Sequence, residues 1–146
     1  MTDLAAYAGL FASAFASATL LPGSSEAALI ALLALGRGDA GLLVAVATAG
    51  NVLGSCVNWV LGRCLSSFRD RRWFPVDERS YERAAAWFRR HGAWSLLLSW
   101  LPVIGDPLTA VAGALRVDFP RFLILVSLGK AARYGFILAA FDAWNR

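Results

Sequence analysis

Leu101-Pro102-Val103-Ile104-Gly105-Asp106-Pro107 interrupts an apolar stretch of membrane-spanning length, and a counterpart, Leu21-Pro22-Gly23-Ser24-Ser25-Glu26, lies eighty positions earlier. In each stretch a carboxylate follows the first proline by four residues. Proline removes a helix hydrogen bond and clashes with the preceding turn, so both stretches predict helix breaks. A broken helix with an acid at membrane depth, once per half, is typical of transporters built from two related halves. The residues predicted to form the breaks are Pro22, Gly23, Pro102, Gly105 and Pro107.

The composition is that of a polytopic membrane protein. Of the 146 residues, 58% are hydrophobic and 16% are charged, and the mean hydropathy is +0.57. Soluble domains carry about 25% charged residues. The predicted fold is therefore an all-α membrane protein with a single domain over residues 1–146.

Positive charge is concentrated between two apolar regions. Eight of the fourteen Arg and Lys residues fall between Arg63 and Arg90. Because cytoplasmic loops of membrane proteins are enriched in basic residues, we expect residues 63–92 to form a cytoplasmic linker. The place of this cluster between membrane segments argues against nucleic acid as a partner.

The apolar segments differ in length. Residues 4–21 predict a helix, and residues 27–35 form a run too short to span a bilayer. Residues 41–62 carry no charge and are long enough to span. Residues 93–115 have spanning length but are broken in the middle, and residues 122–141 predict a last spanning helix.

The uncharged segment 41–62 has one close-packed and polar side. Gly50 and Gly54 form a GxxxG pair, which lets a second helix approach closely. Asn51 and Asn58 are seven residues apart, which places them nearly on the same face. Interhelical hydrogen bonds explain these asparagines at least as well as ligand binding does.

Residues 77–91, within the basic linker, predict an amphipathic helix. Aromatic residues such as Tyr81 and Phe88 fall on one face, and Arg79, Arg83 and Arg90 share another. Such a helix is expected to lie in the cytoplasmic interface of the membrane.

The two halves of the chain, residues 1–62 and 93–146, repeat one plan. Glu26 corresponds to Asp106, and Gly50-Asn51 corresponds to Gly129-Lys130 at an offset of seventy-nine. Each half is predicted to be a re-entrant hairpin followed by one spanning helix. Since an odd number of crossings separates them, the halves are expected to be inverted.

Several of these motifs resemble the DedA superfamily, also called SNARE-associated Golgi or VTT-domain proteins, and in particular its small YqaA-like branch. Leu20 to Glu26 is similar to the family's Pro-Gly-x-x-Glu element, and Gly50-Asn51-Val52-Leu53-Gly54 is similar to its glycine-rich first spanning helix. Ser99 to Pro107 is similar to the second hairpin, and Gly129-Lys130-Ala131-Ala132-Arg133-Tyr134 is similar to a motif of the YqaA-like branch.

The resemblance implies a multi-pass protein of the bacterial inner membrane. Family members are implicated in moving phospholipids or undecaprenyl phosphate across the bilayer, often driven by the proton-motive force. Larger members carry an arginine three residues after the proline of the second hairpin, where this chain has Gly105. Lys130 or Arg133 is left to supply the positive charge.

Four charged residues inside apolar sequence form the candidate site: Glu26, Asp106, Lys130 and Arg133. Two half-helix N-termini, at Ser24-Ser25 and at Asp106-Pro107, suit an anionic phosphate. Glu26 and Asp106 are candidate proton-coupling groups, because loss of water favours the protonated form of a carboxylate. Asp106 is equally explained as the N-cap of a half-helix beginning at Pro107. The residues predicted to bind substrate are Ser24, Ser25, Asn51, Lys130 and Arg133.

The predicted function is proton-coupled translocation of an anionic lipid, and two other functions compete with it. In one, the charges are structural ion pairs of a membrane-organising or assembly protein. In the other, the chain forms a channel, which a homo-oligomer would complete. No His/Cys cluster has metal-ligand spacing and no Ser/His pairing is visible, so we expect no catalytic residue, metal or cofactor. The expected partners are membrane lipids.

Overall fold

A computed structural model describes residues 3–19, 24–65, 78–100 and 105–146, and the regular elements in these ranges are all helices. The predicted all-α class is confirmed. Pro22, Gly23 and Pro102 lie outside the described residues. The elements are α1 (Asp3–Thr19), α2 (Ser24–Ala34), α3 (Ala40–Leu65), α4 (Glu78–His91), the 3-10 helix η2 (Gly92–Trp100), α5 (Gly105–Ala114) and α6 (Phe119–Trp144).

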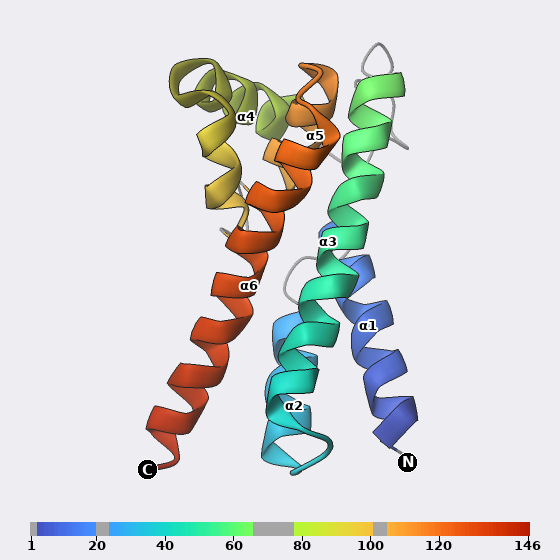
Figure 1. Ribbon diagram of the computed structural model, residues 1–146, viewed down its shortest axis with the longest axis vertical. Coiled ribbons are helices and arrows are strands. Elements are labelled where there is room, and N and C mark those ends of the chain that lie inside the picture. The colour runs from blue at the N-terminus through green and yellow to red at the C-terminus, as the bar shows by residue number, and fades with distance from the viewer. Residues whose placement is uncertain (1–2, 20–23, 66–77, 101–104) are drawn as a thin grey trace.

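Two of these helices, α3 and α6, run most of the length of the molecule (Figure 1). Residues Ala40–Cys64 and Phe119–Trp144 are each long and apolar enough to cross a membrane. They contain the two segments predicted to span, 41–62 and 122–141. The helices pack on each other and form the frame on which the shorter elements lie.

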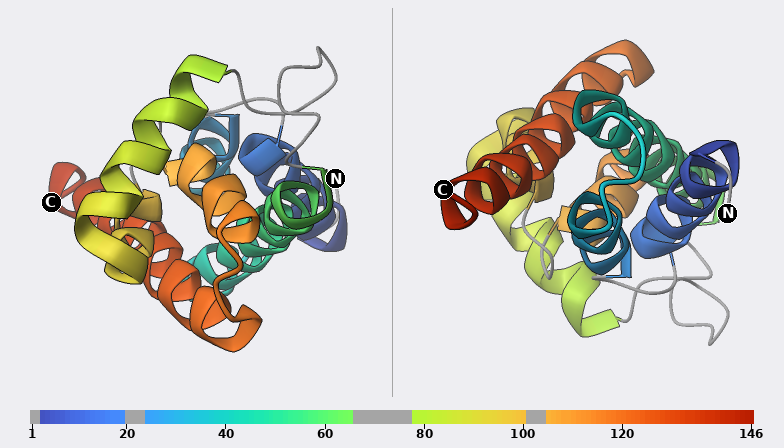
Figure 2. Two further views of the ribbon diagram at one scale, coloured as in Figure 1. Left: turned by 90° about the horizontal axis from the view of Figure 1, so that it is seen from above. Right: turned by 90° about the horizontal axis from the view of Figure 1, so that it is seen from below.

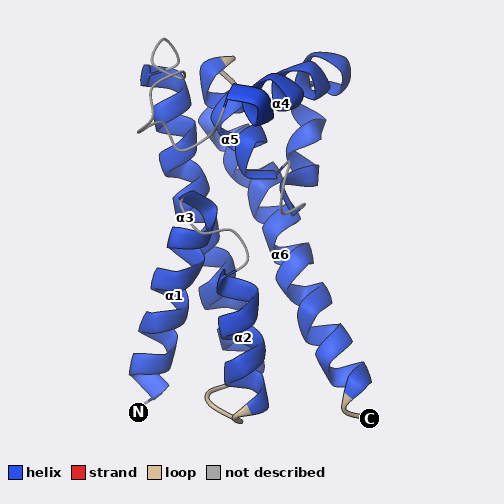
Figure 3. Ribbon diagram, turned by 180° about the vertical axis from the view of Figure 1, so that it is seen from behind, coloured by secondary structure: helices blue, strands red, loops and turns tan. Residues whose placement is uncertain are grey.

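The shorter elements form two hairpins that enter this frame from opposite ends (Figures 1 and 3). Helix α1 runs from one end to the middle, and α2 returns to the same end. From the other end, η2 runs to the middle and α5 returns. The N-termini of α2 and α5 meet the same stretch of α6, where Ser25 contacts Tyr134 and Asp106 contacts Lys130. Each half is therefore a hairpin followed by a long helix, in opposite directions.

Glycines set the close approach of the hairpins to α3. A Cβ added at Gly50 would lie 2.6 Å from the carbonyl oxygen of Phe11, so the predicted GxxxG face packs against α1. At the α3–α5 crossing, a Cβ at Gly62 would overlap the Ala110 carbonyl. A Cβ at Gly113 would overlap the Trp59 carbonyl. Backbone contact at both crossings needs residues without side chains.

Helix α4 lies across one end of the molecule (Figure 2, left). The predicted amphipathic pattern is confirmed: Tyr81 and Phe88 are buried, and Arg83 and Arg90 are exposed. Protein rather than lipid covers the apolar face, however, because α4 packs on α5 and η2. The sequence pattern predicts that one face of α4 is buried, but it does not show whether protein or lipid buries it.

The buried apolar residues form two clusters, one for each hairpin. One surrounds α5 and includes Leu108, Val111 and Phe122, and the other joins α1, α2 and α3 through residues such as Leu10 and Leu29. Along α6, the residues of the first cluster precede Lys130 and those of the second follow it. A layer of buried polar side chains therefore separates the clusters.

Candidate functional site

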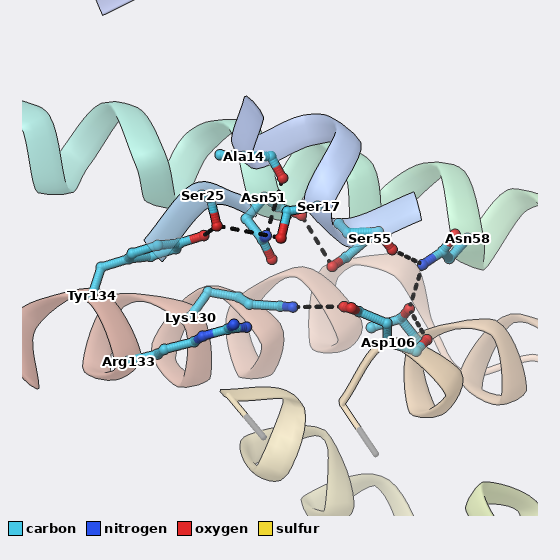
Figure 4. Close-up of polar contacts among 12 residues, drawn as sticks. Ala14, Ser17, Ser25, Asn51, Ser55, Asn58, Asp106, Lys130, Arg133 and Tyr134 are labelled. Atoms are coloured by element: carbon cyan, nitrogen blue, oxygen red, sulfur yellow. Dashed lines mark hydrogen bonds and ion pairs between the residues drawn. The ribbon is translucent and has the colours of Figure 1, made fainter. Parts of the chain in front are cut away.

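The polar layer gathers side chains from α1, α2, α3, α5 and α6 (Figure 4). It lies where the N-termini of α2 and α5 meet the middle of α6. Isolated charges are costly in such a place, so partners are required. Both cations and both acids predicted for the site are present in this layer.

Glu26 and Arg133 form an ion pair between the two halves of the chain. Glu26 is in the first turn of α2, and Arg133 is near the middle of α6. Their side chains are 19% and 10% exposed, so the pair retains access from outside the protein. The structure thus brings together two members of the predicted four-residue site.

Lys130 and Asp106 form a second ion pair, with 2.9 Å between Nζ and Oδ1. The Lys130 side chain is completely buried. The prediction that Asp106 caps a helix beginning at Pro107 is wrong, because α5 begins at Gly105 and the Asp106 carboxylate is held by Lys130. A nearby cation attracts a carboxylate more strongly than a backbone N–H does.

Ser25 links the hairpin of the first half to α6. Its hydroxyl oxygen lies 2.7 Å from the Tyr134 hydroxyl, 3.3 Å from Ser17 Oγ and 3.4 Å from Glu26 Oε2. Asn51 lies beside the same hydroxyls (Figure 4). Its amide nitrogen donates to the Ala14 carbonyl at 3.0 Å, so this asparagine also joins α3 to α1.

Asn58 joins three helices at the other side of the layer. Its amide nitrogen donates to the Ala18 carbonyl at 2.8 Å and to Thr109 Oγ1 at 3.2 Å. Both asparagines therefore make the interhelical hydrogen bonds that the sequence favoured. Among the described residues, five buried side-chain oxygens have no hydrogen-bond partner. One is Glu26 Oε1, which faces Arg133 in the ion pair, and the others are Asn51 Oδ1, Asn58 Oδ1, Ser95 Oγ and Ser99 Oγ. Buried acceptors of this kind are places for ordered water or a ligand.

The remaining predicted residues lie around the polar layer. The Ser24 hydroxyl contacts Ser13 of α1, with 3.4 Å between the two oxygens. Gly105 and Pro107 are buried at the start of α5. At Gly105 an added Cβ would overlap the Ser99 carbonyl, so this glycine lets the hairpin close tightly. Among the described residues, no group of three or more His, Cys, Asp or Glu side chains could hold a metal ion.

Two contributors to the site carry no role in the sequence-based prediction: Tyr134 and Thr109. Tyr134 is four residues after Lys130, so helical periodicity places both on one face of α6. Thr109 is three residues after Asp106 and donates to its carbonyl at 2.6 Å. Both residues could have been found from the sequence, because residues three or four positions after a charged helical residue lie on the same face.

A groove of about 520 Å³ lies near the Glu26–Arg133 pair without being lined by either residue. It lies between α2 and α6, and its described lining is apolar except for Asn145. Ile30 follows Glu26 by four residues and Ile137 follows Arg133 by four, so the groove begins one helical turn from the pair. A charged pair one helical turn from an apolar groove matches an amphiphile with a polar head and an apolar tail.

Two inverted halves around a charged layer, with two helices of spanning length, define the architecture of a helical membrane protein. The chain matches the VTT domain family over residues 21–143. It belongs to that family, and within it to the YqaA-like branch of the DedA proteins.

The similar proteins come from bacteria. The inner membrane protein YqaA of Escherichia coli is 43% identical over 140 residues, which cover 96% of this chain and 94% of that protein. An uncharacterized protein of Haemophilus influenzae is 44% identical over 86% of this chain and 80% of its own length. Undecaprenyl phosphate transporter A of Staphylococcus aureus is 26% identical over 66% of this chain and 52% of that protein. No solved structure gives a significant match.

Proposed function

We propose that this protein translocates an anionic lipid, a phospholipid or a lipid carrier such as undecaprenyl phosphate, across the bacterial inner membrane in a reaction coupled to protons. In this proposal the whole chain acts as one domain that crosses the membrane several times. The α1–α2 and η2–α5 hairpins are re-entrant, and the α4 end faces the cytoplasm. The protein supplies binding and proton exchange and performs no enzymatic reaction.

The Glu26–Arg133 pair is the observation that carries this proposal. It joins the two inverted halves and is partly exposed. An apolar groove between α2 and α6 begins at Ile30 and Ile137, each one helical turn along its helix from a member of the pair. A guanidinium in such a place can bind a phosphate through two parallel hydrogen bonds. The groove has room for part of an acyl chain.

Competition between the Glu26 carboxylate and a lipid phosphate for Arg133 couples proton binding to lipid binding. When Glu26 takes up a proton, the charge that holds Arg133 disappears, and the guanidinium is left to bind a lipid phosphate. When Glu26 loses the proton, its carboxylate competes again for Arg133 and the headgroup is released. A ligand shifts such an equilibrium only through its different affinity for the two states.

The second pair has a different place in the proposal. Lys130 is completely buried, and Asp106 is the partner that compensates its charge. We assign Lys130 to the positive potential that favours a phosphate in the layer, and Asp106 to a second proton position. Ser25 and Asn51 orient the headgroup, because both lie beside the Tyr134 hydroxyl in the same layer. Ser24 contributes the N-terminus of α2.

The comparisons support this substrate class at a distance. The relative from Staphylococcus aureus carries the name of an undecaprenyl phosphate transporter. The relative from Escherichia coli is named an inner membrane protein, which supports the proposed location.

Lipid translocation in reconstituted vesicles tests the proposal. The assay follows a fluorescent phosphatidylglycerol with and without an imposed pH gradient. Wild-type protein should accelerate its movement, and the gradient should increase the rate. Arg133→Ala should lower the rate about tenfold, a factor equivalent to about 1.4 kcal/mol of lost interaction. Glu26→Gln should make the rate insensitive to the gradient. Asp142→Asn, which removes an exposed acid of α6, is the control and should behave as wild type.

A structural role for the charges is the second candidate, and the compensation of each buried charge within the protein favours it. That candidate expects Glu26→Gln to lower the midpoint of thermal unfolding without a separate effect on lipid movement. Equal translocation rates for wild type, Glu26→Gln and Arg133→Ala would contradict transport through this site.

A further inference from the structure

A second groove, of about 870 Å³, lies at the opposite end of the molecule from the apolar groove. The end of α3, the start of η2 and the start of α6 form it. We propose that this groove binds the headgroup and upper acyl chains of an anionic phospholipid from the adjacent leaflet. The described residues that line it include three cations, Arg63, Arg116 and Arg121, and the aromatic residues Trp59, Trp94 and Phe119.

Charge complementarity identifies the ligand class. Asp118 also lines the groove, so the described lining carries an excess of two positive charges. The lining also includes the apolar residues Ala93, Ile124 and Leu125. A basic rim above an apolar wall at the end of spanning helices matches an anionic lipid better than a soluble anion. Its aromatic residues are of the kind that lie at the level of lipid headgroups.

The wall of the groove is held in place by specific contacts. The Trp59 indole N–H donates to the Val117 carbonyl at 3.2 Å, and its ring contacts Phe119 edge-on with 5.2 Å between centroids. The guanidinium of Arg63 lies over the Trp59 ring, 5.1 Å from its centroid. This contact orients one cation of the rim while its other hydrogen-bond donors can face the groove.

Arg116 occupies a backbone position where glycine is expected. It has a φ of 61°, and the hydrogen bonds Val117 N to Ala112 O and Arg116 N to Gly113 O form a Schellman motif at the end of α5. Glycine is the usual residue at this place. An arginine in this left-handed backbone conformation is strained, and its place in the lining of a basic groove suggests that its charge is needed there.

The site can be tested by native mass spectrometry of the purified full-length protein, because binding does not require transport. Dioleoyl phosphatidylglycerol and dioleoyl phosphatidylcholine are titrated separately. Wild type should prefer phosphatidylglycerol. The double variant Arg63→Gln/Arg121→Gln should bind it about tenfold more weakly, as expected from the loss of two interfacial cations. The three arginines are exposed, so folding should be retained.

The matched control is Arg89→Gln/Arg90→Gln, which removes the same charge from exposed positions of α4 that do not line the groove. It should bind phosphatidylglycerol as wild type does. Because both doubles share the central site, a difference between them reports the groove alone. The difference should persist in an Arg133→Ala background, so the result is independent of the proposed transport site.

Arg116→Gly separates binding from stability. It should raise the midpoint of thermal unfolding, because glycine tolerates the left-handed conformation, and still weaken phosphatidylglycerol binding. Equal phosphatidylglycerol affinity in the two double variants, or equal wild-type affinity for the two lipids, would overturn the proposal. Displacement of phosphatidylglycerol by an equal concentration of inorganic phosphate would also overturn it, since the groove would then bind phosphate alone.

Discussion

Lys130 is a cation with a completely buried side chain, and its partner Asp106 comes from a different helix of the same half. Taking an ammonium group out of water costs several kcal/mol, of which the ion pair recovers a part. The position of the Lys130 ammonium group is therefore set by α5, which carries Asp106. This arrangement fixes the start of α5 against the middle of α6.

Removal of one member of this pair should destabilise the protein more than removal of both. We expect Lys130→Met to lower the free energy of unfolding by about 3 kcal/mol, because the Asp106 carboxylate is left without its cation. The double variant Lys130→Met/Asp106→Leu should recover most of that loss. Denaturant unfolding in detergent measures both, and a double variant no more stable than the single one would contradict this account.

The Tyr134 hydroxyl provides a smaller test at the same scale. Tyr134→Phe removes the contact with Ser25 and should cost about 1 kcal/mol. Tyr7→Phe is the matched control, because the Tyr7 hydroxyl accepts a hydrogen bond from the exposed Asp39 N–H at 2.9 Å. Water can replace that partner, so Tyr7→Phe should cost less. Unfolding midpoints of the two variants decide, and an equal loss would argue against a rigid polar layer.

The four charges could be predicted from the sequence, since ionised residues in apolar segments are rare and need partners. Which acid pairs with which base could not, because the pairing depends on the crossing of α2 and α5 with α6. The same crossing explains the error at Asp106. Local sequence indicates a cap there, and the cation that takes its carboxylate is twenty-four residues away.

At the scale of elements, the α3–α5 crossing depends on two glycines in reciprocal contact, Gly62 against Ala110 and Gly113 against Trp59. Gly113→Ala should lower the free energy of unfolding by about 1–3 kcal/mol, because the added methyl group forces the helix backbones apart.

The control is Gly135→Ala on α6, where nothing lies within 4 Å of the added Cβ. It should stabilise α6 by up to about 1 kcal/mol through helix propensity. Thermal unfolding of both variants measures the difference. Similar midpoints would show that the crossing tolerates separation.

The elements themselves followed from periodicity and from the helix-breaking residues, and their bounds lie close to the predicted ones. What covers the apolar face of α4 could not be predicted from the sequence. Amphipathic spacing indicates that one face of a helix is buried. Membrane lipid and the surface of α5 could bury that face equally well. Only the fold of the second hairpin distinguishes them.

At the scale of the whole molecule, the inverted halves predict on which side each loop lies. In a protein without Cys56 and Cys64, single cysteines at Arg37 and Trp144 should react with a membrane-impermeant thiol reagent from outside intact cells. A cysteine at Arg72 should react only after the membrane is opened. Labelling of all three positions from the same side would contradict the inverted topology.

Inversion of the halves could be predicted because one spanning helix separates two similar hairpins. The depth at which the hairpins turn could not, since it depends on how far α1 and η2 penetrate before the polar layer stops them. The structure places the starts of α2 and α5 against the same part of α6, where Ser25 contacts Tyr134 and Asp106 contacts Lys130.

That convergence has an electrical consequence. In the proposed orientation, the Glu26–Arg133 pair lies within the ~30 Å bilayer core, so a charge that reaches it from either side crosses part of the membrane potential. An elementary charge that crosses the whole potential gains about 2.3 kcal/mol per 100 mV. A proton that reaches the Glu26 carboxylate therefore gains part of that energy, and proton binding at this site should depend on the membrane voltage as well as on pH.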